Sequence, residues 1–360
     1  KDIIQPAINH ADDGFIVRSH VDEMWSTGSV MGRMSMLDKF NQFPATRQIY
    51  CDINGDTFPV GTRIKNPDMK RTLERIRDDG AELFYTGDLA HEMVSDITDH
   101  GGLISLDDLK SYKTVRSEPI WGEYQGYKVA CGSPPSGGLM ILQMLNILEH
   151  FDLSSMSHNS ADYITIVAEA MKYSTIAKDN KMGDPAFDKV AIDDFISQNH
   201  AAECAERIKN GEKANVIRFG EPEESRDTTH VSVVDEDGNC VSMTHSLGMP
   251  SGVVSPGMGF MYNGCMGVFD PRPGMPHSIK PGKRRFTAMC PTIVFKDDQP
   301  YIVIGAPGGT FITMGVLQAI LNVINFDMTM LEAVAAPRFT ANSNTIDVSN
   351  RIPHFITQEL

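Results

Sequence analysis

Two strand–turn–strand patterns in the last third of the sequence constrain its fold more than any other feature. The first, TTHVSVVDEDGNCVSMTHS, has two alternating runs around the turn dipeptide Asp237-Gly238, and it predicts a β-hairpin that begins at Thr228. The second, PTIVFKDDQPYIVIGAP, repeats the pattern around Asp297-Asp298. It leads into the apolar segment 311–326, which we expect to be a buried helix. Strands followed by core helices predict a layered α+β or α/β fold.

The first 220 residues are predicted to be mostly helical. An exception is the segment 121–130, whose two short runs around Gln125-Gly126 are typical of a hairpin or an edge strand. A turn is expected at 134–138, followed by an apolar helix from 139 to 151. Further helices are expected to begin at the capping residues Asn66, Asp88, Ser105 and Ser160. The Gly-, Pro- and Met-rich segment 248–283 is predicted to be a long loop that faces a substrate.

The composition is typical of a compact globular protein that handles small molecules. The 360 residues are 41% hydrophobic, and 47 acidic against 32 basic residues give a net charge of −15. Such an acidic surface argues against nucleic acids and anionic membranes as partners. The sequence also contains no apolar run of about 18 residues that would span a membrane. The six cysteines are scattered without CxxC pairs, so we expect isolated thiols rather than a zinc site or a disulfide framework.

Several motifs that would indicate other chemistries are incomplete. HEMVSDITDH begins like a zincin helix, but Ser95 stands where the second His is required. Ser136 in SPPSGG lacks the Gly-x-Ser-x-Gly frame of a nucleophile elbow. His230 and His245 lie in the first hairpin, and we expect them, like the remaining histidines, to occupy surface or core positions.

Thr228 has the position of an N-terminal nucleophile if the bond between Asp227 and Thr228 is cleaved. Thr228 would then carry a hydroxyl and a free α-amine whose pKa is about 7.7–8.0. Such an amine is a general base on the same residue, which a threonine hydroxyl needs because it is inert alone. The start of a strand would hold both groups at the edge of a sheet, where a substrate reaches them.

The dipeptide Gly308-Gly309 is the candidate oxyanion hole. It follows the second hairpin in GAPGGT and precedes the expected helix, so its backbone N–H groups would point to one place near the positive end of that helix. An ordinary turn is the alternative interpretation of the same two glycines.

Seven segments follow one another in the order of a known family over nearly the whole chain. They are GGLISLDDLKSYK, PPSGGLMILQMLNILEHFDL, MGDPAF, TTHVSVVDEDGNCVSMT, PTIVF, GAPGGT and AVAAPRF. Together they resemble the γ-glutamyltranspeptidases, which are N-terminal-nucleophile hydrolases. The resemblance implies a four-layer αββα sandwich of the α+β class. It also implies a precursor that cleaves itself into a large-subunit portion, 1–227, and a small-subunit portion, 228–360.

The same resemblance implies roles for individual residues. Thr228 would form a threonyl ester with the acyl group, and Ser246 would be the hydroxyl that supports it. Gly308 and Gly309 would form the oxyanion hole.

The chain departs from the family in the residues that bind a γ-glutamyl donor. Family members place an Asn, a Gln, an Asp and a Ser-Ser pair where this sequence has Gly248, Cys265, Val268 and Thr287-Ala288. Only the hydroxyl of Thr287 is retained. A buried ammonium without an acidic partner costs on the order of several kcal/mol, so we do not expect free glutamyl recognition. Asp270 would replace the missing acid only after a shift of the loop.

The segment PHSIKPGKRRFTAMCPT resembles the γ-glutamyltranspeptidase-like branch instead. This branch includes amide hydrolases such as oxamate amidohydrolase and some cephalosporin acylases. Arg284 and Arg285 would hold an acidic substrate, or else be solvated or structural. The family also has an N-terminal portion with a carboxylate-binding Arg, and C-terminal strands, that this sequence lacks, so we expect the sequence to be a fragment.

These features together favour a self-processing threonine amidohydrolase or acyltransferase. Its expected partners are a small acidic or γ-glutamyl-like amide and the two subunits of one precursor, with no metal or cofactor. One alternative is a true γ-glutamyltransferase or glutathione hydrolase with altered donor contacts. Another is an uncleaved, non-catalytic homologue. The N-terminus, KDIIQPAINHADDGF, has no apolar signal core and no initiator Met, so we expect the true start to be absent and the location to stay open. Family members with signal peptides are exported, whereas many members of the γ-glutamyltranspeptidase-like branch are cytosolic, and this resemblance slightly favours a cytoplasmic over a periplasmic location.

Overall fold

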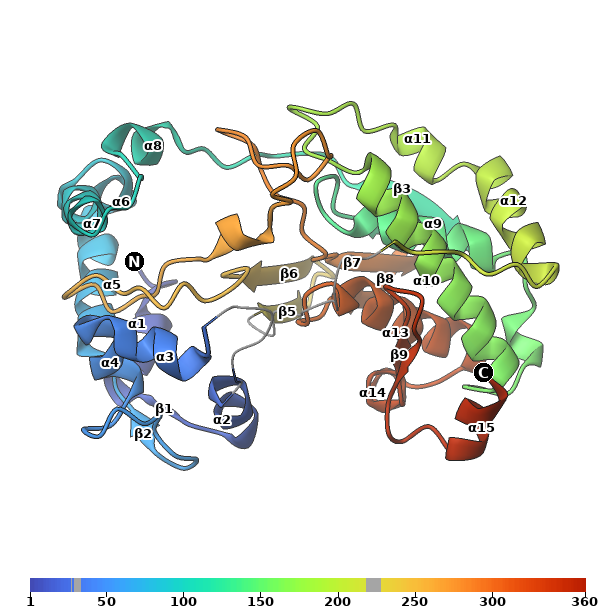
Figure 1. The fold of residues 1–360 in the computed structure, drawn as a ribbon, viewed down its shortest axis with the longest axis horizontal. Coiled ribbons are helices and arrows are strands. Elements are labelled where there is room, and N and C mark those ends of the chain that lie inside the picture. The colour runs from blue at the N-terminus through green and yellow to red at the C-terminus, as the bar shows by residue number, and fades with distance from the viewer. Residues whose placement is uncertain (27, 29–33, 218–227) are drawn as a thin grey trace. The chain divides into compact units, whose positions relative to one another are not determined.

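The computed structural model places the described residues in two compact units (Figure 1). The described residues are 1–26, 28, 34–217 and 228–360. The first unit comprises Lys1–Arg116 and Pro250–Gly264, and the second comprises Ser117–Met249 and Cys265–Leu360. The division into units therefore does not follow the expected cleavage point before Thr228, which lies inside the segment Ser117–Met249 of the second unit.

The first unit consists of helices and a short antiparallel ribbon. Its elements are α1 (Gln5–Asp13), β1 (Phe15–Ile16), α2 (Ser19–Trp25), α3 (Met36–Gln42), α4 (Pro44–Tyr50), β2 (Arg63–Ile64), α5 (Pro67–Asp79), α6 (Glu82–Tyr85), α7 (Asp88–Asp99) and α8 (Leu106–Ser111). The predicted caps of α5 and α8 are confirmed, since Asn66 and Ser105 accept hydrogen bonds from backbone N–H groups in the first turn. The predicted cap Asp88 is wrong, because Gly87 is the N-cap and Asp88 is the first helical residue.

The middle of the predicted loop belongs to this first unit. The buried hydroxyl of Thr46 donates to the carbonyl of Gly252, and that of Thr72 donates to the carbonyl of Met258, each at 2.8 Å. These bonds satisfy backbone carbonyls that would otherwise be buried without a partner. The segment Pro250–Gly264 is therefore anchored by side chains more than 180 residues away in the sequence.

The second unit contains the longer helices and strands. Its elements are β3 (Ile120–Tyr124), β4 (Tyr127–Cys131), α9 (Gly138–Leu148), η1 (Leu153–Ser155), α10 (Ala161–Lys181), α11 (Ile192–Phe195), α12 (Gln198–Lys209), β5 (Thr228–Val234), β6 (Cys240–Ser246), η2 (Cys265–Val268), β7 (Thr292–Lys296), β8 (Gln299–Ile304), α13 (Phe311–Phe326), α14 (Met330–Ala335), β9 (Phe339–Thr340), β10 (Asp347–Val348) and α15 (His354–Glu359). All three predicted hairpins are confirmed. The predicted helix 139–151 ends earlier, at Leu148.

An antiparallel sheet of order β3-β4-β7-β8 forms the centre of the second unit. Its first hairpin turns at Gln125 and Gly126, which have φ angles of 47° and 79°. Strand β4 pairs directly with β7, with Ala130 opposite Ile293. The sheet thus joins strands from the two sides of the expected cleavage point.

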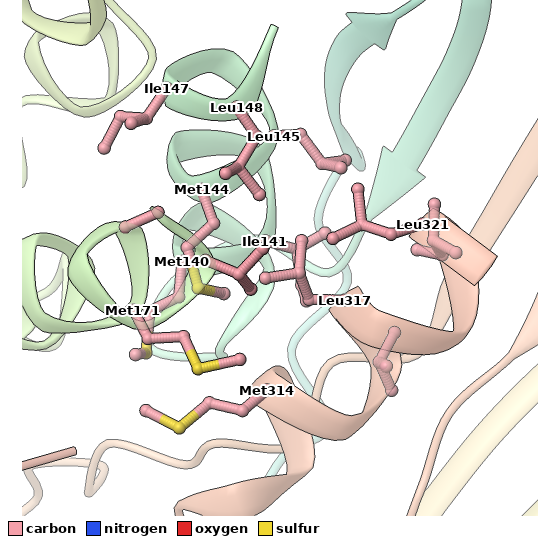
Figure 2. Close-up of a cluster of buried hydrophobic side chains, with 14 of the residues drawn as sticks. Met140, Ile141, Met144, Leu145, Ile147, Leu148, Met171, Met314, Leu317 and Leu321 are labelled. Carbon is pink, nitrogen blue, oxygen red and sulfur yellow. The ribbon is translucent and has the colours of Figure 1, made fainter. Parts of the chain in front are cut away.

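Helices α9, α10 and α13 supply the main hydrophobic core (Figure 2). Every residue of α9 is buried, because this helix packs against α10, α12 and α13 as well as against β3 and β4. Figure 2 shows Met140 and Ile141 of α9 beside Leu317 of α13. In the described part of the chain, none of the helices is both long and apolar enough to cross a membrane.

Candidate active site

Thr228 is the first residue of β5, directly opposite Ser246 at the end of β6. The register of this hairpin is fixed at its far end by Asp235. The Asp235 carboxylate accepts hydrogen bonds from the backbone N–H groups of Asp237 and Asn239 at 3.0 and 2.8 Å. The turn therefore determines which residue of β6 lies beside Thr228. Asp227, the other side of the predicted cleavage bond, lies outside the described residues.

The hydroxyl of Thr228 donates a hydrogen bond to the Oγ of Ser246, at 3.0 Å. The same Ser246 oxygen accepts the backbone N–H of Gly248, at 2.9 Å. This arrangement fixes the rotamer of both hydroxyls at the end of the hairpin. Gly248 has a φ of +70°, a conformation that glycine adopts without steric cost.

His230 connects the hairpin to the end of β8. Its Nδ1 lies 2.9 Å from the Thr244 Oγ1 and its Nε2 lies 3.0 Å from the Ser232 Oγ. Ser232 in turn donates to the carbonyl of Val303, at 2.9 Å. The ring packs so closely on Gly305 that a Cβ there would lie 2.4 Å from it. Burial lowers the pKa of His230, which favours a neutral imidazole.

Gly308 and Gly309 form a tight turn immediately before α13. Their φ angles are +129° and +56°, and their carbonyls accept from the N–H groups of Phe311 and Ile312. Among the residues that the structure describes, no acceptor takes a hydrogen bond from the N–H of either glycine. The helix α13 that follows has 16 residues and adds its positive end to this turn.

The residues at the family's donor-binding positions are only partly brought together. Gly248 and Cys265 are adjacent, since a Cβ on Gly248 would lie 2.7 Å from the Cys265 Sγ. Val268, at the other end of η2, is 42% exposed. The hydroxyl of Thr287 accepts a hydrogen bond from the backbone N–H of Met289 at 3.2 Å, a local contact within the same segment of the chain. Asp270 forms an ion pair with Arg272 rather than replacing the missing acid.

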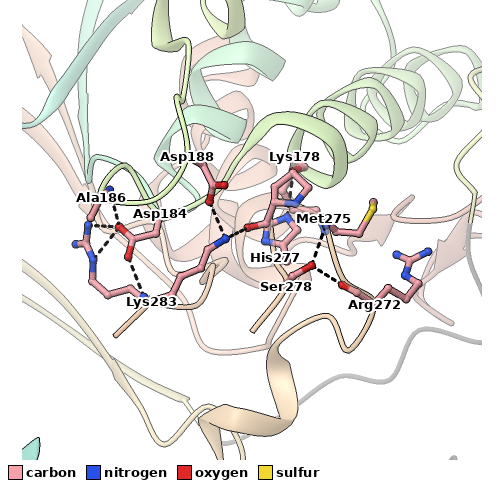
Figure 3. Close-up of polar contacts among 11 residues, drawn as sticks. Lys178, Asp184, Ala186, Asp188, Arg272, Met275, His277, Ser278 and Lys283 are labelled. Carbon is pink, nitrogen blue, oxygen red and sulfur yellow. Dashed lines mark hydrogen bonds and ion pairs between the residues drawn. The ribbon is translucent and has the colours of Figure 1, made fainter. Parts of the chain in front are cut away.

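Arg284 is a structural residue. Its Nη2 and Nε donate to Asp184 at 2.6 and 3.2 Å, and its backbone N–H donates to the same carboxylate at 2.8 Å. Asp184 is 1% exposed, and burial by itself raises the pKa of its carboxyl. The hydrogen bonds from Arg284 and from the backbone of Ala186 lower this pKa by more, so the net effect is a lowered pKa. In Figure 3, the neighbouring Lys283 contacts Asp188, with which it forms an ion pair of 2.7 Å.

The whole chain, residues 1–360, matches the model of the family described as gamma-glutamyltranspeptidase. The chain belongs to the γ-glutamyltranspeptidase family. It is 36% identical over 355 residues to the glutathione hydrolase proenzyme of Escherichia coli strain K12, with 94% of this chain and 60% of that protein covered. It is 34% identical over 367 residues to the acylase ACY 1 proenzyme of Pseudomonas sp. strain SE83, with 100% and 63% covered. This family member therefore spans less than two thirds of the length of these relatives.

A solved structure gives the same result for the fold. The cephalosporin acylase from Bacillus halodurans matches this γ-glutamyltranspeptidase-family chain with a TM-score of 0.80 and 27% identity, covering 98% of this chain and 64% of that one. The predicted family and the predicted αββα fold of the α+β class are therefore confirmed.

Sequence reasoning missed two contacts in this site. The first is at Gly248, where the missing Asn side chain makes room for the side chains of Cys265 and Arg285. The second is that of His230, which contacts Thr244 and Ser232 rather than being an isolated surface or core histidine. The alternating polar residues of β5 and β6 were the available signal for His230, because Ser232 and Thr244 face the same side as its ring.

Proposed function

We propose that the chain is the catalytic part of a self-processing threonine amidohydrolase. The observation that supports this most is the hydrogen bond between the hydroxyls of Thr228 and Ser246 at the very start of β5. A nucleophile needs a fixed position and an adjacent base. The strand and Ser246 supply the position, and the α-amine released by cleavage before Thr228 supplies the base.

The proposed reaction divides amide hydrolysis into two steps. The Thr228 Oγ1 attacks the amide carbonyl, and its α-amine takes the hydroxyl proton and passes it to the leaving amine. The N–H groups of Gly308 and Gly309 stabilise the oxyanion. A water molecule, activated by the same amine, then hydrolyses the threonyl ester and releases the acid. An acceptor amine in place of water would give acyl transfer.

The substrate of this reaction is proposed to be a small acidic or γ-glutamyl-like amide. A true glutathione hydrolase or γ-glutamyltransferase is the second candidate, and the relative from Escherichia coli favours it. The second candidate requires binding of the donor's ammonium group. Asp270 is not available for that, because its carboxylate is paired with Arg272.

The full-length protein with Thr228→Ala tests the proposal. We expect this variant to remain uncleaved on a denaturing gel and to release no amine from any amide substrate. Wild type should give two bands, and N-terminal sequencing of the smaller should begin Thr-Thr-His. Amide hydrolysis that persists in Thr228→Ala would contradict the mechanism. An uncleaved and inactive wild type would instead favour the non-catalytic alternative.

A further inference from the structure

The side chain of Arg285 lies directly against Gly248, whose backbone N–H is bonded to the Ser246 hydroxyl of the candidate active site. A Cβ built on Gly248 would lie 3.2 Å from the Arg285 Nη2 and 3.5 Å from its Cζ. Gly248 itself donates to the Ser246 Oγ, which accepts from Thr228. Gly248 therefore contacts both the guanidinium and the Ser246 hydroxyl, and its lack of a side chain leaves the space that the guanidinium occupies.

Among the described residues, the guanidinium of Arg285 has no anionic partner. Its Nη1 donates to the carbonyl of Phe286 at 2.9 Å, and no carboxylate of the described residues lies within ion-pair distance. Arg284 shows the contrast, since it forms an ion pair with Asp184. A half-buried, fork-shaped cation with open donors is suited to binding a carboxylate through two hydrogen bonds.

We propose that Arg285 binds a carboxylate at the far end of the acyl group, and that the preferred substrates are amides of dicarboxylic acids without an amino group. This inference rests on the proposed function of Thr228 as the nucleophile. A carboxylate on the acyl chain would be attracted by Arg285. An ammonium on that chain would be repelled by the same cation, and the nearby Cys265 and Gly248 offer it no negative charge.

Four p-nitroanilides separate these two effects in the full-length processed enzyme. The glutaryl anilide carries a carboxylate, the 4-aminobutanoyl anilide an ammonium, the γ-glutamyl anilide both, and the butanoyl anilide neither. We expect wild type to have its highest kcat/KM with the glutaryl anilide. In Arg285→Ala, the ratio of kcat/KM for glutaryl over butanoyl should fall about 10- to 100-fold, the size of a charge-assisted hydrogen bond.

Two further variants make this result specific. Arg285→Lys keeps the charge but not the planar fork, so its glutaryl-to-butanoyl ratio should lie between those of wild type and Arg285→Ala. Lys280→Ala removes the same charge from an exposed position five residues earlier in the same loop, and its ratio should match wild type. An equal loss for all four anilides in Arg285→Ala would show a merely structural role and overturn the proposal. So would a wild type that prefers the γ-glutamyl over the glutaryl anilide.

A binding measurement distinguishes failure of this proposal from failure of the catalytic one. Calorimetry with glutarate should show binding to wild type and at least tenfold weaker binding to Arg285→Ala. If glutarate binding depends on Arg285 while Thr228→Ala still hydrolyses amides, Thr228 is not the nucleophile but Arg285 still binds the carboxylate. If wild type is cleaved before Thr228 and active, but glutarate binds wild type and Arg285→Ala equally, Arg285 does not bind the carboxylate but Thr228 can still be the nucleophile.

Discussion

At the scale of single residues, Ser246 has two roles that one oxygen performs together. It accepts one hydrogen bond from the hydroxyl of Thr228 and another from the backbone N–H of Gly248. Ser246→Ala removes both hydrogen bonds and frees the rotamer of Thr228. We expect kcat to fall about 10- to 100-fold, in line with the loss of one or two hydrogen bonds. Steady-state kinetics with the best anilide would measure this, and Ser246→Thr should retain activity because it keeps the hydroxyl. Unchanged kcat in Ser246→Ala would exclude the supporting role.

The proposed base gives a second prediction at this scale. An α-amine of pKa about 7.7–8.0 accepts a proton only in its neutral form. The kcat/KM of the processed enzyme should therefore fall as the pH decreases through that range, with one ionisation on the acidic limb. A pH–rate profile between pH 5 and pH 9 measures it. Activity that is constant from pH 6 to pH 9 would contradict an amine base in that range.

The same residues show what the sequence was able to reveal. The place of Thr228 at the start of a strand was predictable from the alternating pattern and the turn dipeptide, whereas Ser246 was indicated only by the resemblance to a family, because the five-residue connection 235–239 sets the register that places it opposite Thr228. The ion pair of Arg284 was not predictable. Arg284 finds its partner Asp184 at a distance of 100 residues in the sequence, and no local pattern encodes that contact.

At the scale of elements, the packing of the β5–β6 hairpin on β8 depends on the absence of a side chain at Gly305. A Cβ there would lie 2.4 Å from the ring of His230. Gly305→Ala should therefore displace the ring and destabilise the protein by about 1–3 kcal/mol, the usual cost of overpacking. Urea denaturation followed by circular dichroism measures the change. Gly315→Ala, at a position without a positive φ and with no neighbouring atom within 4 Å of the added Cβ, is the matched control and should not destabilise the protein. Wild-type stability of Gly305→Ala would show that His230 does not fix the hairpin.

The loop that carries Arg285 is held by Asp184, which makes its stability depend on pH. The net effect of burial and hydrogen bonding is a lowered pKa, so the folded protein favours the ionised carboxylate. This contribution to stability is present above the unfolded-state pKa of about 3.9 and is lost as the pH falls further through the folded-state pKa.

Asp184→Asn tests whether the ion pair of Asp184 with Arg284 holds this loop. The change removes the charge opposite Arg284 and should destabilise the protein by about 2–3 kcal/mol at neutral pH, less than a fully buried pair because Arg284 is 39% exposed. The variant should also lose less stability than wild type between pH 5 and pH 3. Thermal unfolding at several pH values measures both. Parallel curves for the two proteins would contradict the assignment.

Secondary structure in this chain was mostly predictable because its signals are local. Capping residues, turn dipeptides and alternating runs specify α5, α8 and the hairpins. The cap of α7 was mispredicted since Asp is common both at the N-cap and in the first turn. The end of α9 at Leu148 is set by the chain's exit from the core rather than by any single residue.

At the scale of the whole molecule, the core does not divide where the chain is expected to be cut. Strand β4 lies in the proposed large-subunit portion, 1–227, and pairs with β7 of the proposed small-subunit portion, 228–360. Helix α9 of the first likewise packs on α13 of the second. Strands that are so far apart in the sequence carry no local pattern that identifies them as partners. Their pairing was therefore to be expected only from the resemblance to a family.

This shared core predicts the behaviour of the cleaved protein. Cleavage before Thr228 breaks one peptide bond but no strand pair and no helix contact of the core. The two portions should therefore co-elute as one species in size-exclusion chromatography under native conditions and separate only in denaturant. Their unfolding should be cooperative, because neither portion buries the apolar faces of α9 and α13 alone. The uncleaved Thr228→Ala variant is the matched control and should elute at the same volume. Release of the small-subunit portion in buffer would show that the sheet does not hold the two portions together.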